Sequence, residues 1–143
     1  MKLSLVVPCY NEEGNVKLFA EKARENLADI DYEIVFINDG SKDNTISELK
    51  KIKEERKENI TIVNFSRNFG KEAGIYAGFQ HAKGEYVTII DADLQQPLEV
   101  AREMYDFLEA NEEYDAVAAY QEERKEGRVL TAFKSAFYSI INK

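Results

Sequence analysis

Two aspartates separated by one alanine, Asp91 and Asp93, are the residues of this 143-residue chain best suited to chemistry. They follow an apolar run, residues 86–90, which is typical of a strand buried on both faces of a sheet. Such a strand tolerates carboxylates poorly, so we expect the two acids to lie where it ends. Alternate residues of an extended chain share a face, and two carboxylates in one crevice attract a cation. The pair therefore predicts a site for Mg²⁺ or Mn²⁺, which would in turn hold a phosphate.

The same two acids have a simpler interpretation. Aspartate is common at helix starts, so Asp91 and Asp93 could cap the turn and the helix that follow them. The residues that lie beside them in the folded chain decide between a cap and a metal site.

Five apolar runs predict strands, and segments with helical periodicity lie between them. The runs are residues 2–8, 32–38, 60–65, 86–90 and 114–120. The helical segments are residues 16–27, 46–53, 73–82 and 98–109. This alternation predicts an α/β fold, a mainly parallel sheet with helices on both faces.

Polar segments follow four of the predicted strands. They are residues 10–14, 39–45, 66–71 and 91–96. In open parallel sheets ligands bind beyond the carboxyl ends of the strands, so these segments are expected to form one binding rim. The glycine-rich signatures of dinucleotide-binding folds and P-loops are missing, which argues against those classes.

Asp39 comes directly after the second predicted strand, on the same rim. Its carboxylate could accept hydrogen bonds from a base or a ribose edge. The alternative is a simple Asp-Gly turn formed with Gly40.

The composition indicates one soluble globular domain, residues 1–143, with 44% hydrophobic and 32% charged residues. A net charge of −8 argues against a general nucleic-acid binder. Cys9 is the single cysteine, which excludes an intramolecular disulfide, favours a reducing compartment and suggests a packing role. No segment reaches the length of a membrane span.

Three motifs in this order and spacing resemble the inverting family 2 glycosyltransferases of GT-A fold. They are residues 6–13 (VVPCYNEE), 37–45 (INDGSKDNT) and 90–97 (IDADLQQP). Residues 66–73 and 133–142 resemble a subgroup, the polyprenyl-phosphate sugar transferases that include dolichyl-phosphate mannosyltransferase and bactoprenol glucosyltransferase. The resemblance covers essentially the whole chain and implies a Rossmann-like GT-A domain. Because those relatives continue beyond the position of Lys143, it also implies a domain truncated at its C-terminus.

By this resemblance, most of the site residues bind the nucleotide sugar and three bind the metal ion. The nucleotide-sugar residues are Pro8, Tyr10, Glu12, Ile37, Asp39, Lys71, Asp91, Ala92 and Asp93. The metal ligands are Asp91, Asp93 and Gln95. Simpler roles stay open: packing for Tyr10, a helix cap for Glu12, an ordinary loop amide for Gln95 and a solvated helix start for Lys71.

The implied reaction is a metal-dependent inverting transfer of a sugar from a UDP- or GDP-sugar to a polyprenyl phosphate. The metal ion, Mg²⁺ or Mn²⁺, would neutralise the charge on the departing diphosphate. A hydroxyl acceptor would need a general base, whereas a phosphate monoester, with its second pKa near about 6, is already largely ionised. We expect any catalytic base to lie outside this chain.

Basic residues after the fifth predicted strand could hold the acceptor phosphate. They are Arg124, Lys125 and Arg128, and the resemblance favours Arg124 most. The alternative is a solvated charged loop, because three glutamates lie among them. Residues 129–141 form an amphipathic segment, which could lie near a membrane surface or drive self-association into a homo-oligomer.

Other functions stay open beside this hypothesis. One is a nucleotide-sugar-binding or regulatory module without turnover, and another is a family 2 transferase that acts on a saccharide hydroxyl. An unrelated phospho-acceptor receiver domain would need its acids after the first and third strands, whereas here they follow the second and fourth. The resemblance implies a location in the cytoplasm, at the inner face of the cell membrane in the complete protein.

Overall fold

The computed structural model describes residues 2–56 and 59–120. The chain divides into two compact units, residues 1–105 and 106–143, and the sheet lies in the first. The described elements are β1 (Leu3–Cys9), α1 (Val16–Leu27), β2 (Tyr32–Asn38), α2 (Thr45–Glu55), β3 (Ile60–Asn64), α3 (Lys71–His81), β4 (Tyr86–Ile89) and α4 (Leu98–Ala110). The single domain that the sequence predicts stays a prediction.

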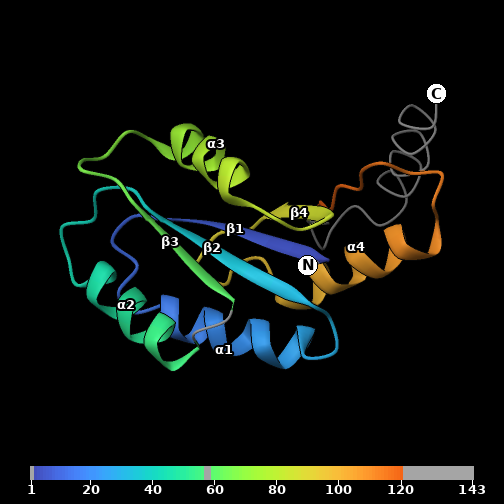
Figure 1. Ribbon diagram of the computed structural model, residues 1–143, viewed down its shortest axis with the longest axis horizontal. Coiled ribbons are helices and arrows are strands. Elements are labelled where there is room, and N and C mark those ends of the chain that lie inside the picture. Colours follow the sequence, from blue (N-terminus) through green and yellow to red (C-terminus); the bar gives the residue numbers. More distant parts are fainter. Residues whose placement is uncertain (1, 57–58, 121–143) are drawn as a thin grey trace, which may run out of the picture. The chain divides into compact units, whose positions relative to one another are not determined.

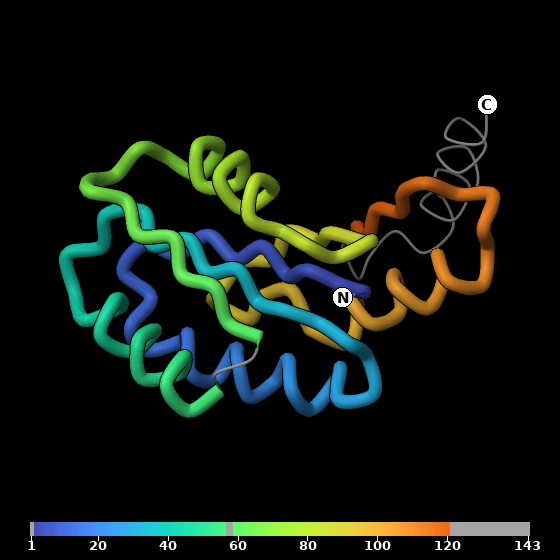
Figure 2. The backbone as a smooth tube through the Cα atoms, in the orientation of Figure 1, coloured from blue at the N-terminus to red at the C-terminus, as the bar shows by residue number. Residues whose placement is uncertain are grey.

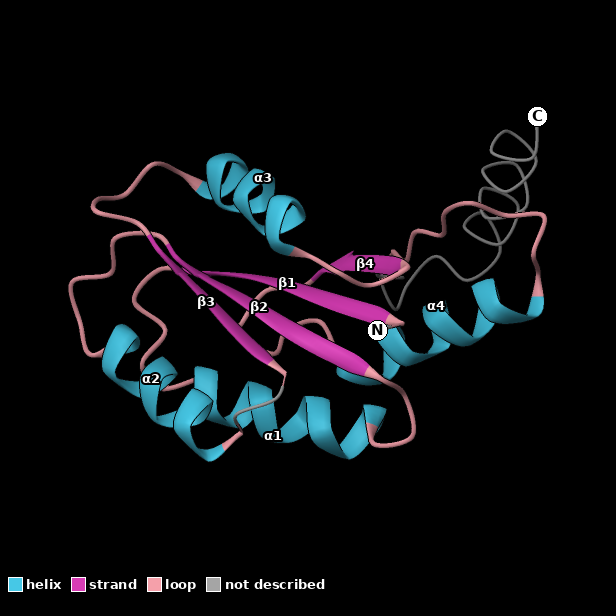
Figure 3. Cartoon of the chain, viewed as in Figure 1, coloured by secondary structure: helices cyan, strands magenta, loops and turns pink. Residues whose placement is uncertain are grey.

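The four strands form one parallel sheet in the order β3-β2-β1-β4 (Figure 1). In its register, Leu3 of β1 lies between Tyr32 of β2 and Tyr86 of β4. Helices α1 and α2 lie on one face of the sheet and α3 lies on the other (Figure 3). The predicted α/β fold, with helices on both faces, is therefore confirmed.

The core has a larger and a smaller half, one on each face of the sheet. On the larger side Leu5 and Val7 are buried with Phe19 and Phe36, whose rings meet edge to face at 6.0 Å. β1 and β2 carry apolar side chains on both faces because they are the central strands, which explains their nearly uninterrupted apolar sequences.

On the smaller side, α3 approaches the sheet very closely. Val6, Val35 and Ile37 form the buried cluster on this face. A Cβ atom added to Gly78 would overlap the side chain of Val6, whereas one added to Gly74 would lie 3.6 Å from Ile37. The absence of a side chain at Gly78 therefore allows α3 to pack directly on β1 and β2.

The prediction that residues 86–90 form a strand buried on both faces is wrong. β4 is at the edge of the sheet that the described residues form, and the side chains of Val87 and Ile89 are each 40% exposed. Ile89 is in register with Val6, so it lies on the face that α3 covers. Because α3 packs over β1 and β2, it leaves this face of β4 uncovered.

The prediction of a fifth strand at residues 114–120 is also wrong. The backbone of this segment is irregular and contains no strand. Alanines at 116, 118 and 119 present little apolar surface, and a strand is stable only beside a hydrogen-bonded partner.

The described helices include none that is both long and apolar enough to cross a membrane.

The loops after β1, β2 and β3 meet at one end of the sheet, on the left of Figure 2. The strands are parallel, so this end carries their carboxyl termini. The predicted polar rim is formed here.

Candidate functional site

A pocket of about 320 Å³ opens at the carboxyl ends of the strands. Six of its lining residues were predicted from the sequence: Pro8, Tyr10, Glu12, Asp39, Lys71 and Asp91. Three more were not assigned a binding role from the sequence: Cys9, Asn68 and Gly70. Asn68 and Gly70 lie in the polar segment after the third strand, and that position was the signal that could have found them.

Four other predicted site residues are not among those that line the pocket. Ile37 is fully buried beneath α3, and Ala92 is 1% exposed in the larger core. Asp93 and Gln95 are exposed, and the Asp93 carboxylate accepts a hydrogen bond of 3.1 Å from the Gln95 N–H. Their roles in binding stay predictions.

The position of Asp93 follows from where the strand ends. β4 stops at Ile89, and the chain turns at residues 92–96, with Leu94 at a positive φ of 62°. The extended geometry that would place Asp91 and Asp93 on one face does not continue to Asp93. The Asp93 carboxylate instead accepts an N–H group within the turn to which it belongs. This contact is similar to the capping role that was the alternative interpretation of the motif.

The loop after β1 is fastened to the loop after β2 by side chains. The Asn11 N–H donates to Ser41 Oγ at 3.0 Å, and the Lys42 N–H donates to Asn11 Oδ1 at 2.8 Å. Asn11 has a positive φ of 54°, a conformation that asparagine tolerates better than most residues.

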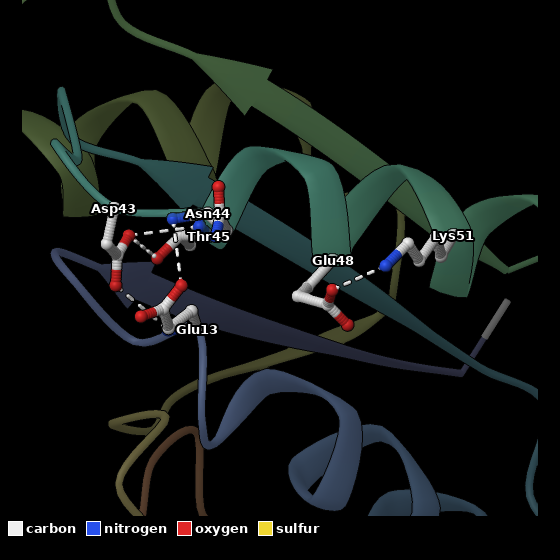
Figure 4. A network of polar contacts seen from close by, with 6 residues as sticks. All are labelled: Glu13, Asp43, Asn44, Thr45, Glu48 and Lys51. Atoms are coloured by element: carbon white, nitrogen blue, oxygen red, sulfur yellow. Dashed lines mark hydrogen bonds and ion pairs between the residues drawn. The ribbon is translucent and has the colours of Figure 1, made fainter.

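A second set of contacts joins the same two loops where α2 begins (Figure 4). The Asn44 N–H donates to Glu13 Oε2 at 3.0 Å, while the Glu13 N–H donates to Asp43 Oδ2 at 3.3 Å. Asp43 also accepts the N–H of Thr45 at 2.9 Å, and the Thr45 hydroxyl accepts the Glu12 N–H at 2.9 Å. These contacts fix the backbone of Glu12 relative to the Asp39 side of the pocket.

Asp39 holds the loop that precedes α3. Its carboxylate is buried and accepts the N–H groups of Phe69 at 2.7 Å and Gly70 at 3.0 Å. Next to it, Gly40 has a φ of +66°, and a Cβ atom there would overlap the backbone of Arg67 and Asn68. The chain bends at Gly40, and Asp39 positions one wall of the pocket.

One ion pair crosses the pocket. Lys71 Nζ, from the first residue of α3, lies 2.7 Å from Asp91 Oδ1, which follows β4. Both side chains are open to solvent, with 58% and 38% of their surfaces exposed.

Cys9 is buried in the larger core and lies near Glu12 and Asp91 of the pocket. Burial raises the pKa of its thiol, and the carboxylates of Glu12 and Asp91 raise it further. A thiol in this setting stays protonated and is a poor nucleophile, as the predicted packing role requires.

The donor set suits a hard divalent cation. The described residues hold no group of three or more histidine, cysteine, aspartate or glutamate side chains that could enclose a metal ion. Mg²⁺ and Mn²⁺ need no such cage, because they are commonly bound by one or two carboxylates, water and substrate phosphates. Asp91, at the wall of an open pocket, fits that mode of binding.

Comparison with known proteins decides the family. The family profile described as glycosyl transferase family 2 matches residues 4–142. The chain belongs to this family. Its parallel sheet, its helices on both faces and its solved neighbours confirm the predicted GT-A-like fold.

Two sequence relatives and one solved structure illustrate the similarity. The prophage bactoprenol glucosyl transferase homolog of Escherichia coli and the bactoprenol glucosyl transferase of Shigella phage SfV are each 40% identical over 146 residues, covering 100% of this chain and 47% of each relative. A mannosyltransferase of Pyrobaculum calidifontis, solved with GDP-Man and Mn²⁺, has a TM-score of 0.71 and 27% identity, covering 90% of this chain and 38% of its own. The family 2 chain therefore spans less than half the length of these proteins.

The predicted acceptor-phosphate residues Arg124 and Arg128, with Lys125, lie outside the described residues. The same is true of the amphipathic segment 129–141. Their roles in the family 2 chain stay predictions.

Proposed function

We propose that this family 2 chain binds a UDP- or GDP-sugar with Mg²⁺ or Mn²⁺ and forms the donor half of an inverting sugar transferase. The acceptor we propose is a polyprenyl phosphate at the cytoplasmic face of the membrane. One observation carries the proposal: Asp39, Lys71 and Asp91, from three separate segments, line one pocket at the carboxyl end of the sheet.

The nucleoside is proposed to lie between the β1 loop and Asp39. Tyr10 is 44% exposed at the pocket, so its ring is free to pack against a base. A carboxylate offers about four acceptor positions, and the two loop N–H groups use two of those on Asp39. The remaining positions can accept N–H groups from a nucleobase or hydroxyl groups from a ribose.

The diphosphate is proposed to lie between Asp91 and the start of α3. Gly70 and Lys71 line the pocket where this helix begins, and the first N–H groups of a helix favour phosphate oxygens. A divalent ion bound through Asp91 would neutralise the charge that develops on the leaving diphosphate. Lys71 adds a positive charge from the protein itself.

The acceptor is inferred from chemistry and from the names of the relatives. Two relatives at 40% identity are named as a bactoprenol glucosyl transferase or its homolog. A phosphate monoester is largely ionised at neutral pH, so it can attack the anomeric carbon without a protein base. We propose that Arg124 and Arg128 hold this phosphate opposite the leaving group, which inverts the configuration of the sugar.

Calorimetric titration tests the donor site. UDP and GDP are titrated into the protein with and without Mn²⁺, and we expect one of them to bind in a metal-dependent manner. Asp91→Asn and Asp93→Ala are expected to abolish the metal dependence, whereas Glu54→Gln, on the exposed side of α2, is a matched control. If neither nucleotide binds with metal, the proposed function is wrong; if Asp93→Ala retains metal-dependent binding, the assignment of Asp93 is wrong.

Incubation of the donor sugar nucleotide with polyprenyl phosphate tests the transfer. We expect a glycolipid product that depends on metal and decreases in Arg124→Gln. Donor binding without any glycolipid would favour the nucleotide-sugar-binding module instead, and sugar transfer to a saccharide hydroxyl would contradict the proposed acceptor.

A further inference from the structure

The pocket contains more negative than positive charge. Glu12, Asp39 and Asp91 are its acids, and Lys71 is the one cation among the described residues that line it. The Asp39 carboxylate is compensated by two backbone N–H groups, and the Asn15 side-chain amide donates to Glu12 at 2.7 Å. The ammonium group of Lys71 compensates Asp91.

The carboxylate that suits a metal ion is thus already paired. Lys71 Nζ lies 2.7 Å from Asp91 Oδ1, which is the distance of a strong charge-assisted hydrogen bond. A divalent ion such as Mg²⁺ binds carboxylate oxygen at about 2.1 Å and carries its own water shell. Two cations on one carboxylate repel each other, so the ammonium group and a divalent ion would compete for Asp91.

We propose that Lys71 is a built-in counter-ion of Asp91 that gives way to the metal ion and then binds the diphosphate of the donor. The inference rests on the proposed function, because it names what Lys71 does at the same site. No covalent bond changes: Asp91 exchanges an ammonium group for a divalent cation, and the ammonium group acquires phosphate oxygens.

The position of Lys71 makes this exchange feasible. Its side chain has four rotatable bonds and is 58% exposed, so it can leave Asp91 without disturbing the core. Solvent-exposed ion pairs change an equilibrium by only about two- to fivefold, which a metal ion with its phosphate ligands readily overcomes.

The exchange makes a prediction in which one substitution has two opposite effects. Without nucleotide, Lys71 only competes, so its removal should strengthen metal binding. With nucleotide and metal, Lys71 contacts the diphosphate, so its removal should weaken nucleotide binding. A lysine with a merely structural role would not produce this change of sign.

The experiment measures Mn²⁺ binding first, without nucleotide, by calorimetry or by the loss of the free Mn²⁺ signal in electron paramagnetic resonance. We expect Lys71→Gln to bind Mn²⁺ about two- to fivefold more tightly than the unchanged protein. Lys71→Arg keeps the ion pair and should bind Mn²⁺ no more tightly. The control, Lys50→Gln, removes the same charge from an exposed position of α2 and should leave the affinity unchanged.

The second titration uses UDP and GDP at saturating Mn²⁺. We expect Lys71→Gln to weaken nucleotide binding about tenfold, and Lys71→Arg to retain most of it, since a charged hydrogen bond to phosphate is lost only in the first variant. Thermal unfolding of each variant confirms that the comparison is made between folded proteins.

The outcomes separate the two claims. The exchange is overturned if Lys71→Gln leaves Mn²⁺ binding unchanged or weaker. It is also overturned if neither the unchanged protein nor the Lys71→Gln variant binds Mn²⁺ without nucleotide. Tighter Mn²⁺ binding together with unchanged or tighter nucleotide binding overturns the transfer of Lys71 to the diphosphate. If the unchanged protein binds neither UDP nor GDP with metal, the proposed function fails, while the titration with Mn²⁺ alone still tests the competition.

Discussion

The Asp39 carboxylate accepts a hydrogen bond of 2.7 Å from the backbone N–H of Phe69, thirty residues further along the chain. The N–H of Gly70 donates to the second oxygen of the same carboxylate at 3.0 Å. One buried acid thus fastens the loop before α3 to the end of β2. Since that loop supplies Asn68 and Gly70 to the pocket and leads into Lys71, the first residue of α3, Asp39 shapes the site as well as lining it.

We expect Asp39→Ala to destabilise the protein by about 2–4 kcal/mol, because the N–H groups of Phe69 and Gly70 each lose a hydrogen bond to a charged group. Asp39→Asn keeps one acceptor oxygen and should lose roughly half as much. Urea denaturation measures the free energy of unfolding for both variants. An alanine variant as stable as the unchanged protein would show that the loop does not depend on Asp39.

Gly78 and Gly74 of α3 provide a matched pair in which the same substitution has opposite effects. A methyl group at position 78 would overlap Val6 and lie 3.0 Å from Ile37, so we expect Gly78→Ala to destabilise the protein by about 1–3 kcal/mol. At position 74 the nearest atoms are 3.6 and 3.8 Å away, so Gly74→Ala should stabilise the helix by up to about 1 kcal/mol. Thermal and chemical unfolding measure both, and equal effects would contradict the close approach of α3 to β1.

Glu33 forms a buried polar network at the opposite end of the sheet from the pocket. One carboxylate oxygen accepts the Ser4 hydroxyl and the Lys83 N–H, each at 2.6 Å, and the Gly84 N–H donates to Ser4 Oγ at 2.8 Å. We expect Glu33→Ala to destabilise the protein by about 2–4 kcal/mol, because these donors would be left without a partner. Nucleotide binding at temperatures where the variant is folded should be unchanged, since the pocket lies at the carboxyl ends of the strands. A variant that folds normally but loses nucleotide binding would contradict this separation.

The lowered pKa of the Asp43 carboxyl predicts that the stability of the protein depends on pH. Desolvation tends to raise the pKa of this carboxyl, but hydrogen bonds from Thr45 and from the Glu13 N–H outweigh it and lower the pKa below the ordinary value of 3.8. A lowered pKa in the folded state stabilises the protein fully above that ordinary value, and the contribution is lost as the pH falls through the folded pKa.

Asp43→Asn removes the titrating group from this position. We expect the difference in unfolding free energy between the two proteins to be constant near neutral pH and to shrink as the pH is lowered below about 4. Denaturation curves recorded across this range measure the difference. A difference that stays constant in acid would show that the contacts of Asp43 do not favour its charged form.

The order of the elements and the location of the site could be predicted because both depend on local patterns. Apolar periodicity marks β1, β2 and β3, and the ends of parallel strands must meet at one edge. Tyr10, Glu12 and Asp39 could therefore be assigned to one rim from the sequence, and all three line the pocket.

Burial at the edge of the sheet could not be predicted in this way. The apolar sequence of β4 suits a central strand, but exposure depends on which helix covers it, and α3 covers β1 and β2. Residues 114–120 have a strand-like sequence, but their backbone is irregular. Pairing between distant segments decides both cases.

The sequence by itself determined the α/β class, the three motifs and the acids at the strand ends, because hydrophobic periodicity and residue type act over a few positions. Only the tertiary structure decided that Asp39 holds the loop before α3, that Ile37 is buried beneath this helix, and that Lys71 pairs with Asp91. Lys71 and Asp91 lie twenty residues apart in the sequence, and their 2.7 Å contact exists because the first residue of α3 and the segment after β4 lie at the same carboxyl edge of the sheet.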